Sequence, residues 1–203
     1  MKTLAAAVIL LVVLTGCATP EARITTFAVA GDSLTAWDND SFPEPRGEFA
    51  DVTWLHWAAS PTIRLSGGYA RQGAFAADIA EAIDEVDAEV LVVMAGSNDI
   101  GVTDPATALA AIEAIVAAAG VDAVVVCAIP PQRGFTAEAT AHNAALVALA
   151  AEHDWAFVDP WVSVRDASGE WVEESTFDGI HPTADGAKAA GALIADAITT
   201  AAD

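Results

Sequence analysis

Residues 26–34, with the sequence TFAVAGDSL, join a short apolar run to a turn that carries a hydroxyl group. The run 26–30 is almost continuously hydrophobic, as are the strands of a parallel sheet that is covered on both faces. Gly31 and Asp32 follow at once and are typical turn residues, so the strand is expected to end there. The segment predicts a strand whose carboxyl end presents the Ser33 hydroxyl, at the edge where α/β sheets bind their ligands.

The rest of the chain repeats this alternation of short apolar runs with longer alanine-rich segments of helical period. Further strands are expected at 62–66, 89–95, 122–129 and 155–158, and further helices at 75–86, 136–153 and 183–199. The clearest helix has Asp104 as its N-cap and Pro105 as its first residue, and it stops at Gly120. The polar stretch 36–50 contains two prolines and predicts a loop. The pattern indicates an α/β fold, a flavodoxin-like three-layer α/β/α sandwich with a five-stranded parallel sheet.

Composition narrows the class of protein. The 203 residues include 29 Asp and Glu against 8 Lys and Arg, for a formal charge of -21, and 54% of them are hydrophobic. This apolar fraction is enough for one folded domain and excludes a disordered acidic chain. So negative a chain is repelled by the phosphates of nucleic acids and by anionic lipid surfaces. We expect a monomer without a cofactor, and without a metal because no Cys/His cluster occurs.

The first twenty residues, MKTLAAAVILLVVLTGCATP, have the features of a targeting segment. The eleven apolar residues of 4–14 are too few for a membrane-spanning helix, which needs about 20. The stretch 14–17, LTGC, resembles the lipobox of bacterial lipoproteins, which implies removal of residues 1–16 and lipidation of Cys17. Residues 17–24 would then tether a domain of residues 25–203 to the outside of the membrane in the bacterial cell envelope. The alternative is an ordinary secretory signal, with a secreted product.

Three separated motifs fall at the predicted carboxyl ends of strands or just before the last helix. They are GDSL at 31–34, GSND at 96–99 and DGIHP at 178–182. Each alone is an ordinary turn or cap sequence. Together they contain the parts of a nucleophilic site, because a serine hydroxyl needs a nearby base such as His181 and that base needs an orienting carboxylate such as Asp178.

In this order, and across nearly all of the chain after residue 24, the motifs resemble those of the SGNH (GDSL) hydrolase family. The resemblance implies Ser33 as nucleophile with Asp178 and His181 completing the triad. It implies an oxyanion hole formed by the Ser33 N–H, the Asn98 amide and the N–H of a glycine in a further motif, SGGYARQGA at 66–74. We assign that glycine to Gly73, with Gly68 as the alternative. This motif departs most from the family pattern, because Ala74 and Phe75 stand where small polar residues are usual.

Other residues are candidates by position. Asp32 lies beside Ser33 and is a tentative substrate contact, and Trp37 in the following loop is a candidate contact for an acyl group or a sugar. The same loop carries four acidic residues that predict a preference for neutral or cationic esters over anionic ones: Asp38, Asp40, Glu44 and Glu48. Cys127 lies within an apolar run and is expected to be a small buried residue, with no disulfide partner.

The sequence therefore predicts a serine esterase that forms an acyl-enzyme on Ser33 and acts on short acyl groups, such as O-acetyl on glycans or small esters. The expected partners are an ester substrate and, through Cys17, a membrane. The same residues are compatible with a lysophospholipase or lipase, with an O-acyltransferase, and with a binding lipoprotein that keeps the fold without catalysis.

Overall fold

The computed structural model describes residues 22–37 and 49–203. The predicted signal segment, Cys17 and most of the tether lie outside the described residues. So do four acidic loop residues, Asp38, Asp40, Glu44 and Glu48.

Five parallel strands form one sheet in the order β2-β1-β3-β4-β5. Their bounds are β1 Thr25–Gly31, β2 Ile63–Ala70, β3 Val90–Met94, β4 Ala123–Cys127 and β5 Ala156–Val158. All five residues of β3 are buried, as expected for a central strand covered on both faces. The predicted α/β class and the five-stranded parallel sheet are confirmed.

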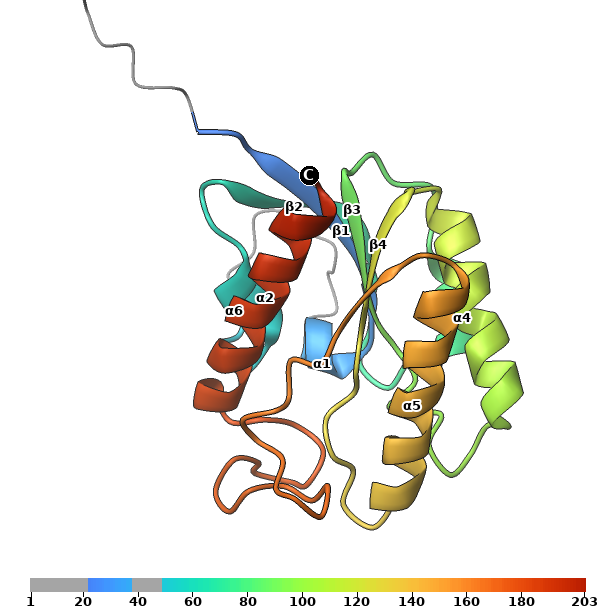
Figure 1. Cartoon of the computed structure of the whole chain (residues 1–203), viewed down its shortest axis with the longest axis vertical. Coiled ribbons are helices and arrows are strands. Elements are labelled where there is room, and N and C mark those ends of the chain that lie inside the picture. The colour runs from blue at the N-terminus through green and yellow to red at the C-terminus, as the bar shows by residue number, and fades with distance from the viewer. Residues whose placement is uncertain (1–21, 38–48) are drawn as a thin grey trace, which may run out of the picture.

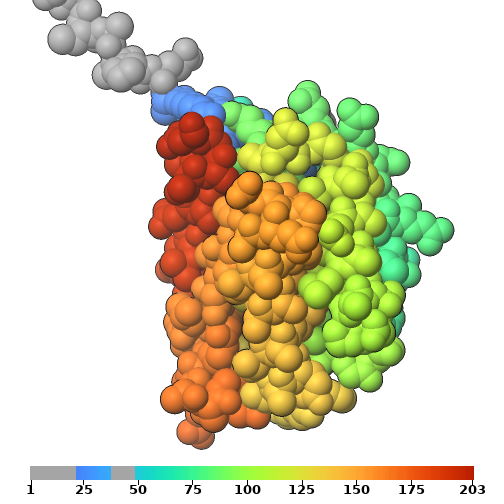
Figure 2. Space-filling model, turned by 45° about the vertical axis from the view of Figure 1, so that its right-hand side comes forward, coloured from blue at the N-terminus to red at the C-terminus, as the bar shows by residue number. Residues whose placement is uncertain are grey.

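Helices cover both faces of the sheet (Figure 1). The helices are α1 Ser33–Ala36, α2 Trp54–Ala58, α3 Ala76–Ala82, α4 Pro105–Ala119, α5 Thr136–Glu152 and α6 Ala184–Ala201. One apolar core joins α3, α4 and α5 to Leu91 and Val93, and the other joins α2 and α6 to Val90 and Val92. Because neighbouring residues of a strand point to opposite faces, these two cores lie on the two sides of the sheet. In Figure 2, α4 and α5 form one continuous outer surface.

The caps of α4 are those that the sequence predicts. The Asp104 carboxylate accepts a hydrogen bond from the Thr107 N–H, and Gly120 ends the helix with φ 68°. Two other elements differ from the prediction. Helix α3 ends at Ala82 instead of 86, and β2 continues to Ala70 instead of ending at 66.

The extension of β2 depends on close approach to β1. The backbone of Gly68 has φ 116° and pairs with Val29, and a Cβ at Gly68 would lie 2.0 Å from the Val29 carbonyl oxygen. Only glycine fits this position, and the pairing register shifts nearby, between Phe27 and Ala28. A run that contains two glycines does not have the composition of a strand, so the predicted strand ended too early.

The carboxyl ends of the parallel strands meet at one edge of the sheet, the lower end in Figure 1. The loops 95–104, 128–135 and 159–183 are at this edge. The chain enters β1 at the opposite edge, where Arg23 forms ion pairs with Glu89 at 2.7 Å and with Asp203 at 2.9 Å. Among the described helices none is long and apolar enough to cross a membrane.

Candidate active site

The serine turn is built by three consecutive residues at the end of β1. Asp32 is the N-cap of α1, and its Oδ1 accepts a hydrogen bond from the Leu34 N–H at 2.9 Å. Gly31 is required because a Cβ there would lie 2.4 Å from Thr35 Oγ1. The result is a tight strand-to-helix turn that begins α1 with Ser33.

A hydrogen-bonded chain links Ser33 to residues from the far end of the sequence. Ser33 Oγ lies 2.8 Å from His181 Nε2, and His181 Nδ1 lies 2.6 Å from Asp178 Oδ2. The structure therefore brings together the three residues that the sequence selects for a triad. The contact with Ser33 is short enough for direct proton transfer, and the contact with Asp178 is short enough to orient the imidazole.

The Asp178 carboxylate is held in one orientation by its own loop. Its Oδ1 accepts hydrogen bonds from the N–H groups of Ile180 at 2.9 Å and His181 at 2.8 Å. Partial burial alone would raise the pKa of Asp178, but the backbone and imidazole hydrogen bonds of His181, with that of Ile180, outweigh it and lower the pKa. The carboxylate therefore stays ionised and can stabilise a positively charged His181.

The backbone of the loop that carries Asp178 and His181 is held by hydrogen bonds from neighbouring residues. Thr176 Oγ1 donates to the His181 carbonyl at 2.7 Å and accepts from the Gly179 N–H at 2.9 Å. Trp171 Nε1 donates to the Gly179 carbonyl at 2.9 Å, and so does the Arg133 N–H at 2.9 Å. No motif identified these fastening residues, because their role depends on contacts between distant segments.

Asp32 is fully buried, so it does not reach the substrate as the sequence suggested. Its Oδ2 accepts a hydrogen bond from Ser97 Oγ at 2.6 Å and lies 3.5 Å from Asn98 Nδ2. Burial raises the pKa of Asp32 to about 6, although hydrogen bonds from Ser97 and Leu34 oppose the rise. Asp32 thus joins the GDSL motif at 31–34 to the GSND motif at 96–99 instead of facing solvent.

The three residues assigned to the oxyanion hole follow β1, β2 and β3, which are neighbours in the sheet. The Asn98 side chain is oriented by a hydrogen bond from Nδ2 to the Ala74 carbonyl at 2.9 Å. Gly73 lies beyond the end of β2 in an exposed turn with φ 72°, whereas the alternative, Gly68, is packed inside β2. The assignment of the oxyanion N–H to Gly73 stays a prediction, and Gly68 is the glycine whose backbone is taken up by the pairing with β1.

Two aromatic side chains surround His181. The ring centroid of Trp37 is 5.1 Å from that of His181, and the Phe177 ring stacks on His181 at 5.9 Å with an interplanar angle of 11°. Trp37 was selected from the sequence, but Phe177 was missed because a single aromatic residue in a loop forms no pattern.

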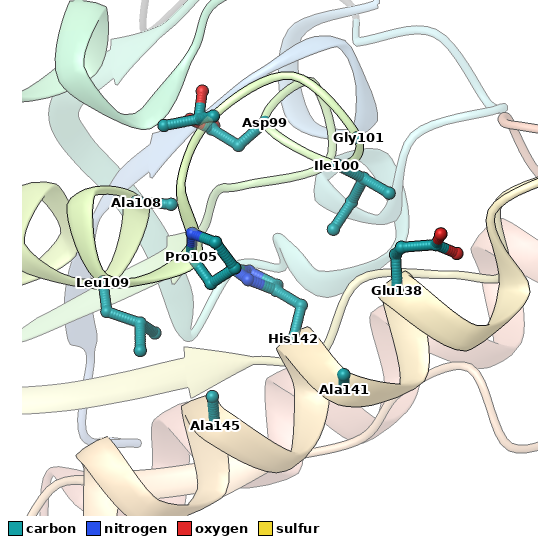
Figure 3. Close-up of a pocket in the computed structure, with 11 residues that line it drawn as sticks. Asp99, Ile100, Gly101, Pro105, Ala108, Leu109, Glu138, Ala141, His142 and Ala145 are labelled. Atoms are coloured by element: carbon teal, nitrogen blue, oxygen red, sulfur yellow. The ribbon is translucent and has the colours of Figure 1, made fainter.

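A separate cavity of about 280 Å³ lies between the loop after β3, α4 and α5 (Figure 3). Its walls include Leu109, Ala145 and His142, and Glu138 lies at one side. His142 is buried, its Nε2 has no well-formed hydrogen bond within the described part of the chain, and burial lowers its pKa. None of the three triad residues lines this cavity.

The other two histidines and Cys127 lie in contacts outside the hydrogen-bonded chain of Ser33. His56 Nδ1 lies 2.8 Å from the Phe49 carbonyl, and His153 Nε2 lies 2.9 Å from Glu113 Oε1. Cys127 is buried, which raises the pKa of its thiol. Within residues 22–37 and 49–203 there is no group of three side chains that suits a metal ion.

Comparison with solved structures shows the same fold. A protein assigned to the G-D-S-L lipolytic family from Desulfitobacterium hafniense has 16% identity and a TM-score of 0.68, over 85% of this chain and 99% of its own. A protein assigned as an acylhydrolase from Bacteroides fragilis has 17% identity and a TM-score of 0.67, over 88% of both chains. A variant of an acetyl-xylooligosaccharide esterase from Geobacillus has 15% identity and a TM-score of 0.65, over 87% of this chain and 94% of its own.

Among curated proteins, none matches the chain significantly. The GDSL-like lipase/acylhydrolase family matches residues 29–189, a span that includes every residue of the hydrogen-bonded chain described above. The protein therefore belongs to the GDSL-like lipase/acylhydrolase family and is an ester hydrolase.

Proposed function

We propose that this ester hydrolase is a serine esterase that cleaves short acyl groups, such as acetyl, from small esters or glycans. The observation that carries the proposal is the chain of hydrogen bonds from Ser33 Oγ through His181 to Asp178. A serine hydroxyl is a poor nucleophile unless a base removes its proton, and His181 Nε2 lies in position to do so.

In the first half of the reaction, Ser33 Oγ attacks the carbonyl carbon of the ester while its proton passes to His181 Nε2. The negative charge on the carbonyl oxygen is stabilised by the N–H groups of Ser33 and Gly73 and the amide of Asn98. His181 then protonates the leaving alcohol, and the acyl group remains on Ser33. In the second half, a water molecule gives a proton to His181 and attacks the acyl carbon, and His181 then returns the proton to Ser33 Oγ as the Oγ–acyl bond breaks and the acid leaves.

Two observations support a small, dissolved ester as the substrate: the activities named for proteins of similar structure, and the edge of the sheet at which Ser33 lies. An acetyl-xylooligosaccharide esterase and an acetyl esterase share the architecture, at TM-scores of 0.65 and 0.61. The chain enters β1 at the edge opposite to Ser33 (Figure 1). A tether from Cys17, with a reach of at most about 25 Å, would therefore direct the site away from its own membrane. This orientation favours dissolved esters or glycans over lipids of that bilayer.

Hydrolysis of p-nitrophenyl acetate and octanoate by the wild type and Ser33→Ala tests the proposal. We expect turnover of the acetate by the wild type, a lower kcat/KM for the octanoate, and loss of both in the variant. Mass spectrometry after rapid acid quenching should show an acetyl group on Ser33. Equal turnover by Ser33→Ala would refute the serine mechanism, and a preference for the octanoate would point to a lipase-type esterase.

We also propose that the mature protein is lipidated at Cys17 and anchored outside the membrane in the bacterial cell envelope. The support is the LTGC stretch at 14–17, which follows an apolar segment too short to span a bilayer. Cys17→Ser should move the protein from the detergent phase to the aqueous phase in Triton X-114 partitioning. Wild-type protein in the aqueous phase would indicate a secreted enzyme instead.

A further inference from the structure

Three aromatic rings contact one another at the exposed side of the triad. Trp37 meets His181 edge to face at 5.1 Å and Phe177 edge to face at 5.4 Å, while Phe177 stacks on His181 at 5.9 Å. The Phe177 side chain remains 52% exposed, although phenylalanine is an apolar residue that proteins usually bury. The protein thus places a ring face in solvent directly beside its proposed base.

The proposed reaction decides which part of a substrate this ring face touches. The carbonyl oxygen of the ester must point to the oxyanion donors. One of these, Asn98, donates a hydrogen bond to the carbonyl of Ala74, which lies just before α3 on the face of the sheet that α3 covers. The leaving oxygen must instead lie within hydrogen-bond reach of His181 Nε2, because His181 protonates it. His181 comes from the loop before α6, which covers the opposite face. The groups around His181 therefore contact the alcohol part of the ester and not its acyl part.

We propose that Trp37 and Phe177 form the subsite for the alcohol part of the ester, and that this subsite selects ring-shaped alcohols with one apolar face, such as pyranosides. The inference rests on the proposed serine esterase mechanism and adds the alcohol specificity. A pyranoside can lay its C–H face on an aromatic ring while its hydroxyl groups stay at a polar rim. Such a rim is present, because the exposed Asp178 follows Phe177 directly and Arg133 Nη1 donates to the Asp178 carbonyl at 3.2 Å.

The backbone of Trp37 supports a ligand-binding role. Trp37 has φ 54° and ψ -123°, a conformation that residues with a side chain rarely adopt. Its backbone N–H donates to the Ser33 carbonyl at 2.8 Å, and its ring lies next to His181 with centroids 5.1 Å apart. Strained residues of this kind gather at ligand clamps and active sites, where the surrounding contacts hold them.

The test compares two acetyl esters that differ only in the alcohol: an O-acetylated methyl xylopyranoside and ethyl acetate. With Phe177→Ala, we expect KM for the sugar ester to rise about tenfold, which corresponds to about 1.4 kcal/mol, and KM for ethyl acetate to change less than about twofold. Phe177→Trp should keep the low KM for the sugar ester because it retains a ring face. Phe177→Leu should behave like Phe177→Ala because it retains only apolar volume.

Phe135→Ala is the matched control, since Phe135 is 45% exposed and packs on Gly101 instead of on the triad. A KM rise of the same size in this control would overturn the proposal. So would equal losses of kcat on both esters in Phe177→Ala with KM unchanged, because Phe177 would then act only through His181. If the wild type hydrolyses neither acetyl ester, the serine esterase proposal itself fails. Turnover of both esters with no difference between the variants refutes only the subsite.

Discussion

The molecule has two regions at the carboxyl edge of its sheet that each combine a histidine, a carboxylate and apolar walls. The serine corner, defined here as Ser33, Asp178 and His181, joins three side chains by hydrogen bonds, with Ser33 buried and Asp178 exposed. The α4–α5 cavity contains His142, whose Nε2 has no well-formed hydrogen bond in the described part of the chain. Of the two regions, only the corner has a serine hydroxyl in contact with an imidazole.

The difference between the two histidines has a physical cause. His181 lies on a loop whose backbone is held by several hydrogen bonds. Its Nε2 contacts the Ser33 hydroxyl, and its Nδ1 contacts the Asp178 carboxylate, which orients the ring. His142 lies on α5 and packs against Gly96 so closely that a Cβ at Gly96 would be 2.3 Å from its Nε2. Burial lowers the pKa of His142, against the nearby Ala95 carbonyl and Asp99 carboxylate, so it stays neutral as a packing residue.

Replacement of each histidine by glutamine gives the largest expected contrast between the regions. His181→Gln removes the proposed base and should lower kcat/KM for p-nitrophenyl acetate by about 10⁴-fold or more, as loss of a triad base does in other serine hydrolases. His142→Gln should leave kcat/KM within about threefold, less than 1 kcal/mol. Both variants are assayed well below their melting temperatures. If His142→Gln were as inactive as His181→Gln, the comparison would break and the cavity would belong to the active site.

The two asparagines near these regions sharpen the same contrast. Asn98→Ala removes one proposed oxyanion donor and should lower kcat by about 10² to 10³-fold with little change in KM, a loss of about 2.7 to 4 kcal/mol. Asn143, next to His142 on α5, instead clamps the Ile129 backbone with two hydrogen bonds of 2.9 Å. Asn143→Ala should lower the melting temperature but not kcat. An unchanged kcat in Asn98→Ala would remove Asn98 from the oxyanion hole.

Much of this organisation was predictable from the sequence, for identifiable reasons. The strands appear as apolar runs because both faces of the sheet are covered, and α4 has caps that local chemistry explains. The predicted end of β2 was wrong because Gly68 pairs with β1 although glycine has a low strand propensity. Helix α2, with five residues, is too short for a periodic pattern.

In the site, the separated motifs selected Ser33, Asp178 and His181, which the fold brings together. The roles of Asp32 and Phe177 were not predictable. Asp32 is buried against Ser97, 65 residues away, and Phe177 stacks on a ring whose position depends on the whole loop. Such contacts exist only in the folded molecule, so no local pattern in the sequence reveals them.

The buried Asp32 carboxylate, which lies beside the corner, predicts a pH dependence of the free energy of unfolding. Burial raises the pKa of Asp32 from its ordinary value of 3.8 to about 6. Between these values the native state keeps a proton that the unfolded chain releases, so this contribution to stability is complete below pH 3.8 and is lost as pH rises through about 6. The total is about 3 kcal/mol.

Asp32→Asn removes this titration, so the free energy of unfolding of the wild type relative to the variant should fall by up to about 3 kcal/mol between pH 4 and pH 7.5. Urea unfolding of both proteins at the two pH values measures this difference. Parallel pH profiles would show that the buried carboxylate does not titrate in this range. Asp104→Asn, at the solvent-exposed N-cap of α4, is the control for replacing a carboxylate by an amide outside the core.

The smallest expected effect comes from filling the α4–α5 cavity. Ala145 lines the cavity, so Ala145→Leu adds apolar volume where space exists and should raise the free energy of unfolding by up to about 1 kcal/mol. Because no triad residue lines the cavity, the ratio of acetate to octanoate turnover should not change. Leu193→Ala, on the outer surface of α6, is the control for a remote change in apolar volume. A selective loss of octanoate turnover in Ala145→Leu alone would show that the cavity receives the acyl chain, and would join the two regions into one substrate site.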